Sequence, residues 1–246
     1  MAGRRIAIVI GTGEYDDQRL TDLRGPAQDA MRLTKFLQDQ KLGKYEVKMF
    51  VNSSSQSVNK AIEKFFASRD RDDTVLFYYS GHGVKDASGR LYFSTTDTST
   101  DMLRSTAISA SFVNEVMNES RSKNQIMLLD CCFSGSFAKG LSDSRGRIVI
   151  TSSSAVQYSF ETKESDDDSL ETGVFTSSMI YGLESGEADL NSDGKITCFE
   201  LFNYIIWKLE DKQMMSMTPK MWAFDLSGDI VISDSSRRDF QVKTQN

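Results

Sequence analysis

The stretch Val75–Val84, VLFYYSGHGV, decides the fold of this chain. Its first half is an apolar and aromatic run typical of a strand buried on both faces. It ends on a turn of small residues that carries His82, the only histidine among 246 residues. A second stretch of the same build, Gln125–Gly135 (QIMLLDCCFSG), carries two of the three cysteines. Each stretch therefore predicts a buried strand with a reactive side chain at its carboxyl end.

The composition is that of a globular α/β domain. Hydrophobic residues make up 39% of the chain, enough for a full core. A net charge of −6 argues against nucleic acid or an anionic membrane as the main partner. No apolar run approaches the roughly 18–20 residues that span a bilayer, and the N-terminal run before Gly11 predicts a core strand instead of a signal peptide. Three cysteines, two of them adjacent, suit a reducing compartment, so we expect a cytoplasmic protein.

Alternating strand and helix patterns predict a mainly parallel sheet with helices on both faces. Strands are expected at residues 5–10, 46–51, 74–80, 91–94, 125–130, 146–152 and 229–232, and helices at 27–42, 55–68, 108–120, 173–183 and 197–212. Ser55 is the expected N-cap of the second helix. The acidic segment Glu161–Glu171 predicts a mobile surface loop. Gly11 and Gly13 predict a strand-end turn, because position 16 holds Asp16 where a dinucleotide-binding fingerprint needs a third glycine.

His82 and Cys132 follow neighbouring strands of the predicted sheet. Reacting groups gather at the carboxyl ends of parallel strands, so the two side chains are expected to meet there. The strand period of two places Asp130 and Cys132 on one side and Cys131 on the other. Cys132 is therefore the predicted nucleophile, His82 the predicted base, and Cys131 a buried packing residue. The main-chain N–H groups of Gly83 and Cys132 are the predicted oxyanion hole.

Each of these residues also has an ordinary structural interpretation. A lone histidine is usually structural, and a buried cysteine is usually an inert core residue. The two together, each on a glycine-flanked turn, favour a thiol–imidazole pair. A serine hydrolase is disfavoured because the chain has no Gly-x-Ser-x-Gly elbow. A zinc site is disfavoured because one histidine and adjacent cysteines lack metal-ligand spacing.

The motifs YYSGHG and LLDCCFSG resemble the two catalytic motifs of the caspase-like cysteine peptidases. In caspases the histidine lies about 50 residues before the cysteine, and His82 and Cys132 share that family spacing. The caspase signature Gln-Ala-Cys-Arg-Gly is absent, and the run from Asp130 to Gly135 is similar to the metacaspase pattern instead. The resemblance extends from about Arg5 to about Ile232 and includes DLRGPAQDAMRLTKFL, ITSSSAVQYSFE and GVFTSSMIYGL. It implies a caspase-like α/β sandwich over residues 1–233, with a polar C-terminal tail over 234–246.

The resemblance also implies a substrate pocket. In metacaspase-like members an acidic pocket selects Arg or Lys before the cleaved bond, and the matching positions are Asp29, Ser80 and Asp130. A carboxylate at Asp130, two residues before the nucleophile, would pair with a guanidinium or ammonium group. The ordinary interpretations are a solvated helix carboxylate for Asp29 and a strand-end cap for Asp130.

A second motif predicts a calcium site. Residues 189–200, DLNSDGKITCFE, match an EF-hand loop, with Gly194 at the sharp turn. The predicted ligands are Asp189, Asn191, Asp193, the carbonyl of Lys195, Thr197 and Glu200. EF-hands pair through the position held here by Ile196, and no second loop is found, so weak binding is expected. The ordinary interpretation is an Asp-Gly turn followed by a helix N-terminus.

The sequence also offers candidates for the control of activity. Lys139, Arg145 and Lys163 are candidate self-cleavage sites, and a separate activator protein is a possible partner. The main hypothesis is a cysteine endopeptidase acting on proteins after Arg or Lys, with calcium influencing it. The alternatives are a catalytically silent interaction module of the same fold and a calcium sensor with incidental cysteines.

Overall fold

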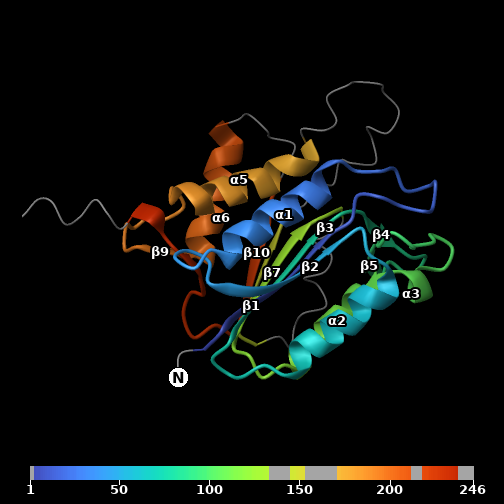
Figure 1. The fold of residues 1–246 in the computed structure, drawn as a ribbon, viewed down its shortest axis with the longest axis horizontal. Coiled ribbons are helices and arrows are strands. Elements are labelled where there is room, and N and C mark those ends of the chain that lie inside the picture. The colour runs from blue at the N-terminus through green and yellow to red at the C-terminus, as the bar shows by residue number, and fades with distance from the viewer. Residues whose placement is uncertain (1–2, 133–144, 153–170, 212–217, 238–246) are drawn as a thin grey trace, which may run out of the picture.

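Six strands form the central sheet, in the order β10–β8–β7–β3–β1–β2. The computed structural model describes residues 3–132, 145–152, 171–211 and 218–237 (Figure 1). The central strands are β1 (Arg5–Gly11), β2 (Tyr45–Val51), β3 (Thr74–Ser80), β7 (Asn124–Asp130), β8 (Arg147–Thr151) and β10 (Lys220–Phe224). All neighbouring pairs are parallel except β10 with β8. The predicted α/β class with a mainly parallel sheet is confirmed.

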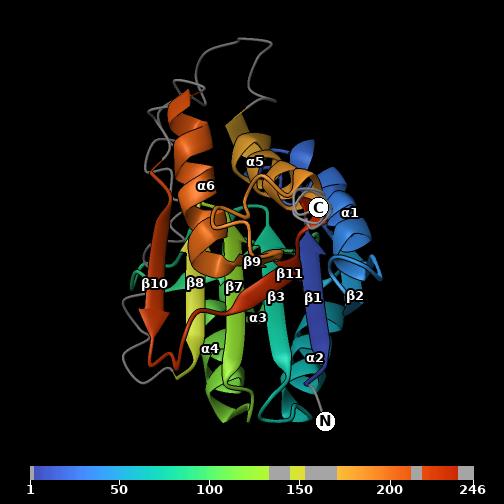
Figure 2. The same ribbon diagram turned by 90° about the vertical axis from the view of Figure 1, so that its left-hand side faces the viewer.

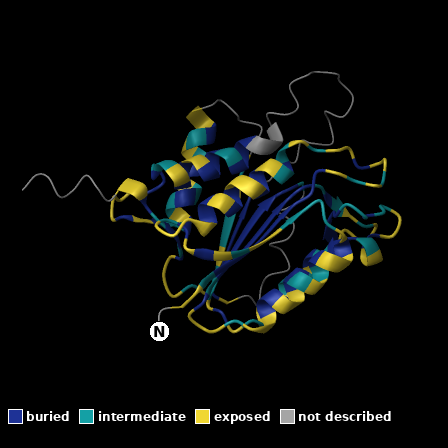
Figure 3. Ribbon diagram, viewed as in Figure 1, coloured by how far each residue is buried: buried dark blue, intermediate teal, exposed yellow. Residues whose placement is uncertain are grey.

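Helices cover both faces of this sheet (Figures 1 and 2). The helices are α1 (Gly25–Gln38), α2 (Ser55–Ala67), α3 (Leu103–Thr106), α4 (Ala110–Glu119), α5 (Glu171–Ser185) and α6 (Cys198–Asp211). One core lies between the sheet and α1, α5 and α6, and a second lies between the sheet and α2 and α4. Figure 3 shows the buried strands between helices whose outer faces are exposed. Near-continuous apolar runs such as those of β1, β3 and β7 are what burial on both faces requires.

Two small sheets flank the central one. The first contains β4 (Gly83–Lys85), β5 (Leu91–Phe93) and β6 (Ile108–Ser109), and the second pairs β9 (Lys195–Thr197) with β11 (Val231–Asp234). The first begins one residue after His82, and the second contains part of the predicted calcium loop. Each small sheet therefore includes or adjoins residues singled out in the sequence.

The two faces follow the alternation along each strand. Leu76 and Tyr78 of β3 belong to the core under α1, α5 and α6, whereas Phe77 and Tyr79 belong to the opposite core. Ser80 continues the first series, toward α1 and α5. This period of two decides which residues at the strand ends can share a site.

The helix boundaries correct three predictions. The first helix ends at Gln38 and not at Leu42, because the carboxylate of Asp39 accepts the N–H groups of the following turn. Ser54, whose hydroxyl accepts the N–H of Ser57, is the N-cap of α2, and Ser55 instead bonds Asp97. The predicted helix over 108–120 begins with a two-residue strand, β6, because Ile108 pairs with β5.

The segment that follows α6 holds one strand more than predicted. β10 and β11 stand where the sequence predicted a single strand near 229–232. The expected tail from residue 234 also begins inside the fold, because Asp234 ends β11 and forms ion pairs with Lys44 at 2.6 Å and Arg5 at 3.7 Å. Strand pairing and ion pairs distant in sequence leave no local periodic pattern, which is why both features were missed.

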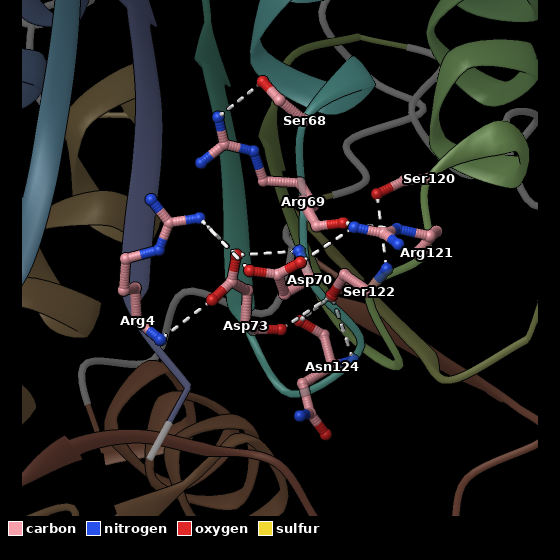
Figure 4. A network of polar contacts seen from close by, with 9 residues as sticks. All are labelled: Arg4, Ser68, Arg69, Asp70, Asp73, Ser120, Arg121, Ser122 and Asn124. Carbon is pink, nitrogen blue, oxygen red and sulfur yellow. Dashed lines mark hydrogen bonds and ion pairs between the residues drawn. The ribbon is translucent and has the colours of Figure 1, made fainter. Parts of the chain in front are cut away.

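A polar network closes the amino-terminal end of the sheet (Figure 4). Asp73, nearly fully buried, accepts the main-chain N–H of Arg4 at 2.9 Å, its guanidinium at 3.0 Å and the N–H of Asp70 at 3.0 Å. Arg121 donates to Asp70 at 2.8 Å, and the Ser122 hydroxyl donates to the Asp73 carbonyl at 2.7 Å. These bonds join the entries of β1, β3 and β7. Among the described helices, none is both long and apolar enough to cross a membrane.

Candidate active site

The predicted catalytic residues come from the ends of adjacent strands. β3 and β7 pair in parallel with Ser80 opposite Asp130, and the N–H of Gly81 donates to the Asp130 carbonyl at 3.3 Å. A Cβ placed on Gly83 would lie 2.2 Å from the carbonyl oxygen of Cys132. The turns that carry His82 and Cys132 are therefore in direct main-chain contact, and only glycine fits at position 83. The same contact brings together the two residues of the predicted oxyanion hole.

The two adjacent cysteines have different surroundings. Cys131 is 6% exposed and belongs to the core under α2 and α4, as the strand alternation predicts. Burial, followed by the nearby Cys132 and Asp130, raises the pKa of the Cys131 thiol well above its ordinary value. Cys131 is therefore held as an unreactive thiol. Cys132 is partly exposed, as a nucleophile that meets a substrate must be.

His82 is held through its main chain by two tyrosines. Its N–H donates to the Tyr15 hydroxyl at 3.0 Å, and its carbonyl accepts from the Tyr79 hydroxyl at 2.9 Å. The preceding Gly81 has a φ of +150°, and a Cβ there would lie 2.7 Å from the Tyr79 hydroxyl. The turn therefore requires glycine both for its conformation and for the close approach of the tyrosine.

The imidazole of His82 faces the loop between β1 and α1. Its Nε2 lies 2.8 Å from the carbonyl oxygen of Thr21, and the ring centroid lies 4.9 Å from that of Tyr15. A carbonyl oxygen can only accept, so this bond places a proton on Nε2 and leaves Nδ1 of the neutral ring as the basic nitrogen. Sequence reasoning missed Thr21 because it acts through its main chain, which any residue type supplies.

The three predicted pocket residues lie together on the α1 and α5 side of the sheet. Asp29 of α1, Ser80 of β3 and Asp130 of β7 are all buried. Asp130 accepts the hydroxyl of Thr176, on α5, at 2.6 Å, and Thr176 in turn accepts the Tyr78 hydroxyl at 3.0 Å. Among the described residues, Oδ2 of Asp29 has no hydrogen-bond partner. Thr176 was not predicted, although it lies within the family-like motif GVFTSSMIYGL.

Both carboxyl groups of this pocket are hard to ionise. Burial, together with the nearby Asp130, raises the pKa of Asp29 to about 7, against a smaller opposite effect of Arg32. Burial raises the pKa of Asp130 to about 6, although hydrogen bonds from Thr176 and Ser152 act the other way. Two buried carboxylates without a cation are unfavourable unless a positive group binds between them.

The comparisons with known proteins agree with this geometry. The sequence profile of the caspase domain matches residues 4–239, nearly the whole chain. The chain belongs to the caspase-domain family. Proteins of this family are cysteine peptidases, and peptidases act on protein substrates, so the positions of His82 and Cys132 can be interpreted in that chemistry.

Two solved structures share the fold at low sequence identity. Protein GSU0716 from Geobacter sulfurreducens is 14% identical, with a TM-score of 0.64 over 92% of this chain and 95% of its own. Caspase-1 from Spodoptera frugiperda is 15% identical, with a TM-score of 0.62 over 95% of this chain and 91% of its own. A search of curated proteins found no match to this caspase-domain chain. At these identities, the similarity establishes the caspase fold and leaves individual residue roles to the geometry.

The predicted calcium loop of this caspase domain lies between α5 and α6. Asp189 is buried and accepts the N–H groups of Asp193 and Gly194 at 3.2 and 3.1 Å. Glu200 accepts the N–H of Asn191 at 3.2 Å and the hydroxyl of Thr197 at 2.8 Å. The oxygen donors are those that calcium prefers, and they surround one short loop. Within the described residues, however, no three His, Cys, Asp or Glu side chains already converge as metal ligands.

The loop has a partner strand that the sequence did not reveal. Ile196, the residue through which paired EF-hands associate, is fully buried and pairs with Ser233 of β11. Ser235 donates its N–H to the Gly194 carbonyl at 3.0 Å. β11 therefore pairs with this loop at the position through which EF-hands associate.

The candidate self-cleavage sites are described only in part. Lys139 and Lys163 lie outside the described residues, and so does the acidic segment except for Glu171, which begins α5. Arg145 is exposed, whereas Arg147 two residues later is fully buried and donates to Gln125 at 2.9 Å. Arg145 is thus the one of the three whose surroundings are described.

Proposed function

We propose that this caspase-family chain is a cysteine endopeptidase that cleaves proteins after Arg or Lys, with Cys132 as nucleophile and His82 as general base. The observation that carries the specificity is the buried carboxyl pair Asp29 and Asp130 beside the turn of Cys132, in which Oδ2 of Asp29 has no hydrogen-bond partner among the described residues. Retaining such a pair costs folding free energy, and a cationic substrate side chain would offset this cost on binding.

The reaction follows from the tautomer of His82. Nδ1 takes the thiol proton of Cys132, and the sulfur attacks the carbonyl carbon of the scissile peptide. The negative charge that develops on the carbonyl oxygen would be stabilised by the N–H groups of Gly83 and Cys132. The C–N bond then breaks, and the imidazolium returns its proton to the leaving amine. Water, deprotonated by the imidazole, hydrolyses the thioester and releases the thiol.

Specificity for Arg or Lys is supported by the position of the pocket. Ser80 and Asp130 end β3 and β7, two residues before His82 and Cys132. A substrate side chain that reaches Asp29 and Asp130 would place its own carbonyl near the sulfur. The Thr176 hydroxyl occupies one oxygen of Asp130 and so limits how that carboxylate can turn. A planar guanidinium suits two carboxylates better than a single charge does.

Calcium binding at 189–200 is a further part of the proposal. Asp189, Asn191, Asp193, Thr197 and Glu200 would supply side-chain oxygens, and Lys195 would supply its carbonyl. The ion would draw together carboxylates that now accept main-chain N–H groups. The same α5 that enters this loop carries Thr176, which gives calcium a route of influence on the pocket. Self-cleavage at Lys139, Arg145 or Lys163, and a separate activator protein, remain proposals.

A peptide-library digestion with and without calcium tests the proposed function. The wild-type chain should cleave after Arg and Lys, and Cys132→Ala should show at least ~10⁴-fold less turnover. Cys198→Ala, which removes a buried cysteine at the start of α6, is the matched control and should retain activity. Cleavage after Asp with none after Arg or Lys would contradict the pocket assignment. Full activity in Cys132→Ala would contradict the nucleophile.

A further inference from the structure

We propose that Tyr15 is a positioning residue for His82. The Tyr15 hydroxyl holds the His82 main chain and the Tyr15 ring lies beside the imidazole, so that together they keep the imidazole in the orientation that proton transfer needs. This inference rests on the peptidase function proposed above. Tyr15 lies in the β1–α1 loop, residues 12–24, and neither the sequence motifs nor the family comparison assigns it a role. It touches His82 through both its hydroxyl group and its ring.

The hydroxyl of Tyr15 joins two parts of the site. It accepts the N–H of His82 at 3.0 Å and donates to the carbonyl of Thr12 at 2.6 Å. Thr12 in turn donates its N–H to the carbonyl of Ser80 at 2.9 Å. The phenol thus fixes the His82 turn relative to the ends of β1 and β3. Burial raises the pKa of Tyr15 above its ordinary value, so the hydroxyl keeps its proton throughout the working pH range.

The ring of Tyr15 restricts the imidazole from one side. The two ring centroids are 4.9 Å apart and the planes are inclined at 43°. The Thr21 carbonyl accepts from Nε2 at 2.8 Å, and it belongs to the same loop as Tyr15. The imidazole is therefore held between an aromatic surface and an acceptor that are only six residues apart in the chain. Rotation about its side-chain bonds would break one contact or the other.

The loop itself is well fixed, so it can act as a template. The N–H of Tyr15 donates to the Asp22 carboxylate at 3.0 Å, and the N–H of Leu23 donates to the Gly13 carbonyl at 2.8 Å. Gly13 also donates its N–H to the Asn52 side chain at 2.9 Å, which ties the loop to the end of β2. A positioning group is effective only if its own support is rigid, because an error of about 1 Å can cost about 100-fold in rate.

The experiment compares Tyr15→Phe with Tyr45→Phe. Tyr45 is buried against α1, and its hydroxyl has no hydrogen-bond partner among the described residues, so its removal should leave activity unchanged. For Tyr15→Phe we expect kcat to fall about 10- to 100-fold with KM changed less than twofold. Tyr15→Leu, which also removes the ring, should fall further. Unfolding temperatures of all variants show that each is folded.

Nuclear magnetic resonance gives a readout independent of peptidase activity. Because His82 is the only histidine, its imidazole ¹⁵N signals are unambiguous and report the tautomer and the titration of that ring directly. In the wild type and Tyr45→Phe we expect the Nε2–H tautomer, and in Tyr15→Phe a mixture with a displaced titration midpoint.

The two readouts separate the inference from the function on which it rests. Unchanged ring signals together with unchanged kcat in Tyr15→Phe would overturn the positioning role. If the wild type cleaves no peptide, the peptidase proposal fails, and the ring signals alone decide whether Tyr15 orients His82. If Tyr15→Phe is unfolded, Asp22→Asn, which weakens the bond to the Tyr15 N–H, should displace the same signals by a smaller amount. Signals identical to the wild type in Asp22→Asn would then overturn the inference.

Discussion

Buried carboxyl groups at the two ends of the central sheet have pKa values shifted in opposite directions. At the amino-terminal end, burial acts to raise the pKa of Asp73, but bonds from Asp70 and Arg4 outweigh it and hold that pKa below its ordinary value. At the carboxyl end, burial raises the pKa of Asp29 to about 7 and that of Asp130 to about 6. At the first end hydrogen bonds and an ion pair satisfy the buried carboxylate, whereas at the second end burial disfavours ionisation of both carboxyl groups.

This contrast explains why the site lies where it does. Parallel strands bring the side chains that follow them to one edge, and the helices then begin there with free N–H groups. The β1–α1 loop and the turns after β3 and β7 meet at that edge. At the opposite edge the loop before β3 is tied to β1 and β7 by ion pairs and hydrogen bonds (Figure 4).

The largest expected effect is on cleavage after Arg. Asp29→Asn and Asp130→Asn each remove one of the two buried carboxylates that would pair with the substrate guanidinium. We therefore expect kcat/KM to fall about 30- to 5000-fold, equivalent to ~2–5 kcal/mol. Steady-state kinetics with an Arg peptide measures this. Glu63→Gln, an exposed residue of α2, is the matched control. Equal activity in all three variants would contradict the assignment of Asp29 and Asp130 to the binding of the substrate Arg.

The next effect is on stability, with opposite signs at the two ends. A raised folded-state pKa means that Asp29 costs stability as pH rises from about 4 to about 7, so at pH 8 Asp29→Asn should stabilise the fold by about 1–3 kcal/mol. Asp73, with its lowered pKa, contributes stability above the unfolded-state pKa, and Asp73→Asn should lose about 1–3 kcal/mol.

Urea unfolding at pH 8 measures both changes. Repeating it at pH 4 should abolish most of the gain in Asp29→Asn, because the wild-type carboxyl is then protonated in the folded state and only about half ionised in the unfolded state, so little of the penalty remains. A loss of stability in Asp29→Asn at pH 8 would mean that Asp29 is satisfied in the folded chain, which would contradict the comparison.

A smaller effect concerns the pH dependence of substrate binding. The pKa values of about 7 and about 6 mean that the pocket loses its charge as pH falls from 7.5 to 5.5. KM for an Arg peptide should therefore rise about tenfold over this range. The same peptide with citrulline in place of Arg should show a much flatter KM, since it carries no charge. Parallel profiles for the two peptides would assign the titration to another group.

The smallest expected effect links the calcium loop to stability. Asp234 connects the neighbourhood of this loop to Arg5 and Lys44 at the amino-terminal end of the sheet. Calcium should therefore act mainly on the stability of that end. Calcium at three times its Kd should stabilise by about 0.8 kcal/mol, or about 2–3 °C in unfolding temperature. Glu200→Gln should abolish the shift, whereas Glu210→Gln on the exposed face of α6 should keep it. An identical shift in both variants would place the ion elsewhere.

Much of the fold followed from local patterns. The apolar runs of β1, β3, β7 and β8 predicted buried parallel strands to within a residue or two, because burial on both faces demands continuous apolar sequence. The short edge strand β10 escaped prediction because it pairs with β8 across a long separation in sequence. Ser54 caps α2 in place of the predicted Ser55, because Ser55 bonds the carboxylate of Asp97, which is distant in the sequence.

For the site, the sequence by itself determined which residues follow the buried strands. The local apolar pattern and strand period placed Ser80, His82, Asp130 and Cys132 at the carboxyl ends of two strands, and the pairing of β3 with β7 sets Ser80 opposite Asp130. The tertiary structure alone decided how they are held. The Thr21 carbonyl, the Tyr15 phenol and the Thr176 hydroxyl approach from elements far along the chain. Contacts of this kind depend on how loops and helices pack, and a main-chain acceptor carries no mark in the sequence.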